Sequence, residues 1–210
     1  MSDTPPAPPR GRLVVVSGPS GVGKDTVLTH LHRVMPDVLR CVTATTRRPR
    51  PGEVPGRDYL FLSVAEFRDL VEADAFLEYA NVHENLYGTP RAWVEARRDE
   101  GQDVLLKIDV QGGLTVRAQV HDAVLVFLRP PTVAELERRL RARLTETEEE
   151  IVRRLLNARS ELQQMPLYDY AVINDEVHRA ADLLRAIILA ERCRVHPDHG
   201  GAHWHDHHAG

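Results

Sequence analysis

The sequence predicts a three-layer α/β fold, in which a parallel β-sheet lies between two layers of helices. Short apolar runs, typical of strands buried on both faces, alternate with amphipathic helical segments along the chain. A glycine-rich stretch joins the first of these strands to the first of these helices. The chain has 210 residues, 42% of them hydrophobic, which is enough to bury the core of one sizeable domain.

The first predicted unit is a strand, a loop and a helix. Residues 12–18, RLVVVSG, form a continuous apolar run that ends in glycine. Residues 25–35 then place four aliphatic side chains at helical spacing, and Pro36 ends the helix.

The later elements follow from the same contrast between continuous apolar runs and helical spacing. In chain order we expect a short strand at 59–62, helices at 63–74 and 90–101, strands at 103–110 and 123–130, helices at 132–144 and 146–164, a strand at 170–175 and a helix at 179–194.

Composition limits the classes of partner. The formal net charge of −4 gives no support to a nucleic-acid or an acidic-membrane partner. Cys41 and Cys193 lie far apart without metal-ligand spacing, so we expect two buried thiols rather than a disulfide. Without a signal peptide or a membrane-length apolar run, we expect a cytoplasmic protein. Both a monomer and a homo-oligomer remain open.

The two ends of the chain differ from its middle. Residues 1–10 are proline-rich and predict a disordered arm before a domain at 11–195. Residues 196–210 hold six of the eleven histidines. This tail is either a disordered polar segment with incidental affinity for Zn or Ni ions, or a specific metal site.

The stretch SGPSGVGKDT predicts a phosphate-binding loop. Its glycines allow backbone angles that aim successive N–H groups inward, the following helix adds the positive end of its dipole, and a lysine follows. An acid, Asp25, replaces the usual hydroxyl, but a carboxylate can ligate Mg²⁺ directly and Thr26 offers a hydroxyl one residue later. The predicted loop comprises Gly18, Pro19, Ser20, Gly21, Val22, Gly23, Lys24, Asp25 and Thr26.

A second basic motif is TATTRRPRPGEVPGRDY, in which four arginines crowd a loop punctuated by proline and glycine. Such a run is often solvated and disordered. Here Tyr59 and the strand-like YLFL that it opens favour an ordered grip on a phosphate group by forked guanidinium groups.

With these motifs in hand, the chain resembles the guanylate kinases from about Gly11 to about Arg194. The resemblance is carried by SGPSGVGK, TTRRPRPGEVPGRDY, FLEYANVHENLYGT, IDVQG, PPTVAELERRLRAR and TETEEEIVRRL, in the family's order. It implies a P-loop NTPase core, a small mixed α/β GMP-binding lobe at about 41–93 and a helical lid at about 134–159. The implied reaction converts ATP and GMP, or dGMP, to ADP and the diphosphate.

The resemblance assigns the GMP phosphate to Arg47, Arg50, Tyr59 and Tyr87, and the guanine to Thr43, Glu78 and Thr89. A carboxylate at Glu78 can accept from guanine N1–H and the N2 amino group together, and the two threonine hydroxyls can donate to O6. AMP would leave these groups unpaired. Taken alone, Glu78 would be an exposed acid at a strand end.

For phosphoryl transfer the resemblance implies a catalytic set of Lys24, Arg47, Asp109, Arg139, Arg143 and Arg154. The last three are lid arginines that could close over the phosphates and exclude water. Asp109 ends an apolar strand, where an acid can orient Mg²⁺ or its water shell. The neighbouring Arg138, Arg141 and Arg153 fit ordinary solvated helix charges better.

Three positions depart from the family pattern: Asp25 for a serine, Lys107 for an acid, and Leu144 for a glycine in the lid. Strand alternation places Lys107 on the same side as Asp109. We hypothesise that Lys107 offsets the charge at Asp25; independent drift of the two positions is the alternative. Leu144 would stiffen the lid turn.

Two other functions remain to be weighed. One is a same-fold kinase with another phosphorylated acceptor, such as ribose 1,5-bisphosphate, since related kinases can carry GKD; Glu78, Tyr87 and Thr89 argue against it. The other is a guanylate-kinase-like binding module without catalysis, whose degenerate phosphate loop would contrast with the intact loop found here.

Overall fold

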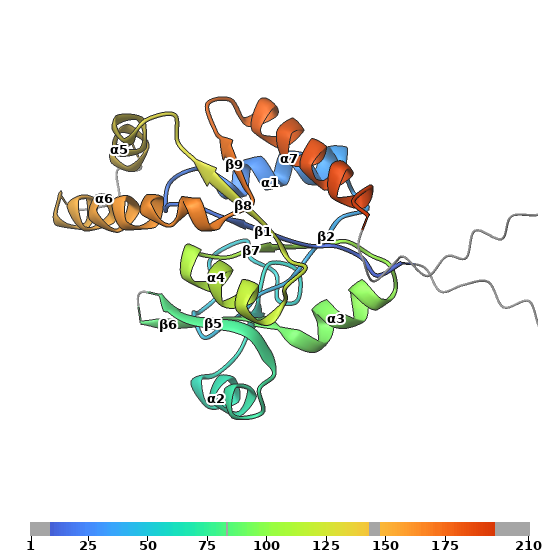
Figure 1. The fold of residues 1–210 in the computed structure, drawn as a ribbon. Helices are drawn as coiled ribbons and strands as arrows, with labels where there is room; N and C mark the ends of the chain where they lie inside the picture. Colours follow the sequence, from blue (N-terminus) through green and yellow to red (C-terminus); the bar gives the residue numbers. More distant parts are fainter. Residues whose placement is uncertain (1–8, 83, 143–147, 196–210) are drawn as a thin grey trace, which may run out of the picture.

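The computed structural model describes residues 9–82, 84–142 and 148–195 (Figure 1). Most of the predicted arm and the whole histidine-rich tail therefore lie outside the described residues, as do Arg143 and Leu144. No helix in the described ranges is long and apolar enough to cross a membrane.

The predicted parallel sheet is confirmed. It has five strands in the order β2-β7-β1-β8-β9, and every neighbouring pair is parallel. The strands are β1 Leu13–Ser17, β2 Leu39–Arg40, β7 Val104–Lys107, β8 Val124–Arg129 and β9 Tyr170–Ile173. All five residues of the central strand β1 are buried, as the apolar run at 12–18 predicts.

Helices cover both faces of this sheet, which confirms the three layers (Figure 1). The helices α1 Lys24–Val34 and α7 Val177–Arg192 pack on one face, while α3 Arg91–Asp99 and α4 Val110–Gln119 lie on the other. Alternate residues of β1 serve the two cores: Val14 and Val16 face α1 and α7, whereas Leu13 and Val15 face the opposite layer.

A second, smaller sheet lies beside this core in the order β4-β3-β6-β5. Its strands are β3 Ala44–Thr45, β4 Leu60–Phe61, β5 Phe76–Val82 and β6 Asn85–Pro90. The helix α2 Val64–Glu72 begins with a capping box between Ser63 and Glu66 and stacks Phe67 on Phe76, with ring centroids 4.6 Å apart. The sequence predicted β4 and α2 but not the other three strands.

Two further helices pack on each other at the end of the parallel sheet (Figure 1). They are α5 Val133–Arg141 and α6 Glu148–Gln163, and the short 3₁₀ turn η1 Met165–Leu167 follows them. Their contact is apolar, because Leu136, Leu140 and Ala158 are buried between them. The sequence predicts both helices within a few residues of these bounds.

The helix α4 was not predicted, because Gly112 and Gly113 mask it. A Cβ atom on Gly113 would lie 2.4 Å from the Tyr168 hydroxyl, so close packing rather than flexibility explains this glycine.

The expectation of two buried thiols holds for Cys41 alone, since Cys193 is exposed; both are free. Burial raises the pKa of the Cys41 thiol to about 12.

Candidate functional site

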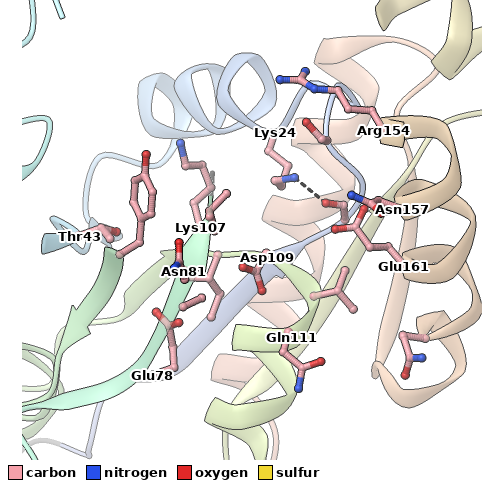
Figure 2. Close-up of a pocket in the computed structure, with 18 of the residues that line it drawn as sticks. Lys24, Thr43, Glu78, Asn81, Lys107, Asp109, Gln111, Arg154, Asn157 and Glu161 are labelled. Carbon is pink, nitrogen blue, oxygen red and sulfur yellow. Dashed lines mark hydrogen bonds between the residues drawn. The ribbon is translucent and has the colours of Figure 1, made fainter. Parts of the chain in front are cut away.

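A cavity of about 890 Å³ opens at the carboxyl end of the parallel sheet. It is lined by the glycine-rich loop, the residues that follow β7, the edge of the smaller sheet and one face of α6 (Figure 2). Sequence-predicted residues from five separate motifs meet here: Gly18, Ser20, Lys24, Thr43, Tyr59, Glu78, Tyr87, Asp109 and Arg154.

The loop between β1 and α1 has the backbone that a phosphate cradle requires. Gly21 and Gly23 have φ of 84° and 95°, values that residues with a side chain rarely adopt. Lys24 opens α1, and its ammonium donates to the carbonyl of Gly18 at 2.5 Å and of Pro19 at 3.1 Å. These carbonyls hold the ammonium over the cavity until an anion takes their place.

Burial dominates the electrostatics of Lys24. Removal from water lowers the pKa of its ammonium to about 8, against an opposing effect from the nearby carboxylate of Glu161. Burial also raises the pKa of Glu161, while Lys24 and a hydrogen bond from the Ser20 backbone lower it. The Glu161 carboxyl therefore lies beside Lys24 and the Ser20 amide, where an anion bound by the loop would also lie.

Sequence reasoning missed Glu161. It lies on α6 with Arg154 and Asn157, and the three line the cavity together (Figure 2). Their spacing of three and four residues places them on one helix face, and this was the available signal. The cavity is also lined by residues that the sequence analysis did not assign to the site, including Arg40, Asn81, Gln111 and Arg153.

Asp25, in the first turn of α1, is paired with a lysine at the end of the strand β7. Its Oδ1 atom accepts from Lys107 Nζ at 2.6 Å, and Arg40 Nη2 lies 3.5 Å from the same oxygen. Burial raises the pKa of the Asp25 carboxyl, but the pairing with Lys107 outweighs it and the pKa lies below its usual value. The contact required by the hypothesis that Lys107 offsets Asp25 is thus present.

Asp109 follows the end of β7 rather than lying within it. The strand ends at Lys107, and Asp109 is the N-cap of α4, where its Oδ1 atom accepts from the Gly112 amide at 2.7 Å. This corrects the strand predicted at 103–110. The cap fixes the carboxylate at the cavity wall, opposite Lys24 (Figure 2).

Glu78 is a buried acid, not an exposed one at a strand end. Only 5% of it is accessible, and its Oε1 atom accepts from the Thr89 hydroxyl at 2.6 Å. Burial raises its pKa to about 7, and this donor only partly offsets the effect. A hydroxyl has one proton, which Thr89 gives to Glu78, whereas Thr43 lines the cavity.

The arginine-rich loop is ordered around Glu53. Arg47 Nη2 donates to both Glu53 oxygens, at 2.8 and 3.0 Å, and the Arg50 amide donates to the same carboxylate at 2.7 Å. The Arg47 guanidinium also lies 5.3 Å from the Tyr59 ring centroid. Within the described chain, Tyr59 and Tyr87 line the cavity and Arg47 and Arg50 do not.

The predicted lid arginines take different places. Arg139 donates to the carbonyl of Val22 at 3.2 Å and of Asn174 at 3.0 Å, so it braces the glycine-rich loop from outside the cavity. Arg154 lines the cavity, and Arg143 lies outside the described residues.

The arginines expected to be ordinary surface charges are all exposed. Arg138 pairs with Glu135, and Arg141 with Glu137 and Glu148, on the exposed side of their helix. Arg153 is exposed as well, and it also lines the cavity.

Comparisons with known proteins agree on one family. The family model described as "Guanylate kinase" matches residues 10–191. Guanylate kinase of Caldanaerobacter subterraneus is 47% identical over 186 residues, covering 89% of this chain and 90% of the relative. That of Desulfitobacterium hafniense is 47% identical, covering 88% and 92%. The solved guanylate kinase of Anaplasma phagocytophilum has a TM-score of 0.72 and 31% identity, covering 89% of this chain and 88% of that one.

Proposed function

The chain belongs to the guanylate kinase family, and on that premise we propose that it transfers the γ-phosphoryl group of ATP to GMP, or to dGMP, in the cytoplasm. One observation carries the proposal. A single cavity holds both the lysine of a phosphate loop, Lys24, and a buried carboxylate that matches guanine, Glu78. The two substrates would therefore meet within one cavity.

The donor end of the cavity suits a triphosphate. Backbone N–H groups of residues 20–24 and the positive end of α1 would hold the phosphate oxygens, with Lys24 as a compact charge among them. A bound phosphate would favour the charged form of the Lys24 ammonium, because its negative charge would compensate for the hydration that burial removes. Arg139 supports this loop through Val22 rather than by touching the nucleotide phosphates.

The acceptor end suits guanine. The Glu78 carboxylate would accept from N1–H and the N2 amino group, and Thr43 would donate to O6. Thr89 keeps the carboxylate oriented, so the base meets a preset acceptor. Adenine offers no matching donor pair, and its binding would leave a buried carboxylate unpaired, which costs far more than a lost contact at the surface.

The acceptor phosphate would lie near Tyr59 and Tyr87, within reach of the arginine-rich loop. In the described structure, Glu53 holds the fork of Arg47. The Arg47 guanidinium would turn from Glu53 toward the phosphate when GMP binds, exchanging one anion for another, and the Arg50 side chain would join it there.

The residues present fit a magnesium ion bound with ATP. Asp109 offers a carboxylate oxygen at the cavity wall, Asp25 offers another behind Lys107, and Mg²⁺ is commonly held by one or two carboxylates together with substrate phosphates. Among the described residues no cluster of three His, Cys, Asp or Glu could hold a metal by itself. When bound, the ion would neutralise charge on the phosphate oxygens; Lys24 and Arg154 would do the same from the protein side, and α6 would exclude water.

The test is ADP release with ATP, Mg²⁺ and a panel of acceptors. We expect turnover with GMP and dGMP and none with AMP, CMP, UMP or ribose 1,5-bisphosphate. Silence with GMP alongside turnover of another acceptor would refute the guanine assignment and favour the same-fold kinase. Binding of GMP without any turnover would favour the non-catalytic binding module.

A further inference from the structure

The second lysine of the chain occupies an unusual place in the cavity. Of 27 Lys and Arg residues only Lys24 and Lys107 are lysine. Lys107 is the last residue of β7, and its ammonium donates to Asp25 at 2.6 Å, which joins the end of β7 to the first turn of α1. Both lysines of this arginine-rich chain therefore reach the same cavity.

Lys107 lies between the two halves of the site. In Figure 2 it is flanked by Lys24 on the phosphate-loop side and by Thr43 on the guanine side. Its side chain is 18% exposed, so it is largely enclosed but still reaches the cavity surface. A ligand that spans both halves must pass this ammonium.

Stability alone does not explain the pair. The Asp25 side chain is 72% exposed, and ion pairs with an exposed partner contribute little to folding. The ammonium of Lys107 also lies near that of Lys24, at the wall of the same cavity. Two ammonium groups side by side become favourable when an anion lies between them. A compact ammonium also fits between phosphate oxygens better than a planar guanidinium.

We propose that Lys107 is a substrate contact, whose ammonium binds the acceptor phosphate on the side facing the glycine-rich loop, and that Asp25 is the positioning residue that aims it. The inference rests on the proposed function and deepens it at the acceptor site. Lys24 then serves the donor phosphates and Lys107 the acceptor phosphate, with the arginine-rich loop on its other side.

The small number of lysines makes a direct test possible. Protein carrying ¹³C at the lysine ε-carbon gives two lysine signals, which Lys107→Arg assigns. GMP is added without ATP or Mg²⁺, and calorimetry on the same sample establishes saturation. We expect GMP to shift the Lys107 signal and guanosine, which lacks the phosphate, to leave it near its starting position. A Lys107 signal unmoved at saturating GMP would overturn the proposal.

A double-mutant cycle tests the role of Asp25. Asp25→Ser and Lys107→Met should each weaken GMP binding, with Lys107→Met costing about tenfold, as expected for a charge-assisted contact. If Asp25 acts through Lys107, the double variant binds GMP no more weakly than Lys107→Met alone. Additive losses would contradict the positioning role.

A matched control is available near the amino end of β2. Asp37 also pairs with a cation at 2.6 Å, but that cation, Arg192, does not line the cavity as Lys107 does. Asp37→Ser should leave GMP affinity unchanged. If the unmodified protein binds no GMP, the proposed function itself fails; if it binds GMP and not AMP while the Lys107 signal stays fixed, only the role of Lys107 fails.

Discussion

Glu78→Gln should stabilise the empty protein at neutral and alkaline pH while it impairs the reaction. The carboxyl is buried, and burial raises its pKa from 4.5 to about 7. Glutamine keeps the shape and an oxygen that can accept from Thr89, but it carries no charge. The variant therefore removes the cost of burying an anion and also removes the acceptor that a guanine base needs.

The sign and the size of the stability difference between the two proteins follow from the raised pKa of Glu78. Below pH 4.5 the carboxyl is protonated in both the folded and the unfolded states, so its charge costs nothing. As the pH rises through 4.5 to about 7, the unfolded chain ionises first and the folded protein loses stability, by about 3 kcal/mol in total. Glu78→Gln lacks this loss, so its advantage should grow over that interval and then level off.

Urea unfolding of both proteins at a series of pH values measures this difference, because the other titrating groups cancel between them. Thr89→Val provides a second variant. It removes the donor that lowers the Glu78 pKa, so its loss of stability should extend to higher pH. In turnover, Glu78→Gln should reduce kcat/KM for GMP about a hundredfold, as expected for lost hydrogen bonds to a charged group. A stability difference independent of pH would refute the reasoning.

Three further substitutions test other parts of the structure. Lys24→Met should lower kcat at least about a hundredfold without lowering Tm, because a buried charge is removed; a lower Tm in thermal unfolding would contradict this. Arg98→Leu should cost about 1–3 kcal/mol in urea unfolding, since it leaves the buried Gly11 carbonyl without its donor and Asp122 without its buried partner; an unchanged stability would contradict it. Gly113→Ala should cost about 1–3 kcal/mol through the clash with the Tyr168 hydroxyl, and Tyr168→Phe in the same chain should recover part of it.

The parallel core could be predicted because its elements carry local signals. The run at β1 is apolar at each of four successive positions, and α1 has helical spacing and a proline beyond its end. Apart from β4, the strands of the smaller sheet carry no such signal. The strand β3 has two residues, as does the unpredicted edge strand β2 of the parallel sheet, and β5 alternates exposed and half-buried side chains only after Glu78, so tertiary pairing decides these strands.

The predicted site depended on the same distinction between local and long-range information. Motif residues such as Lys24 and Glu78 were found because their neighbours in sequence define them. Glu161 was missed because its partners, Lys24 and the Ser20 amide, lie far away in the sequence, in the glycine-rich loop. The contact between Lys107 and Asp25 could be predicted. Strand alternation places the Lys107 side chain on the side of the cavity, and the negative charge of Asp25 favours a cation beside it.

The buried charges of the cavity are explained by the ligands rather than by the fold. Burial moves Lys24 and Glu78 toward their neutral forms, so each costs stability in the empty protein. A phosphate restores the charge of Lys24, and the N–H groups of guanine restore that of Glu78, so substrate binding recovers what folding gives up at both ends. For Glu161 the sign is opposite, because a phosphate near Lys24 repels it and takes its partner. A donor phosphate would therefore displace or protonate the Glu161 carboxyl, while Arg154 on the same face of α6 would attract the phosphate.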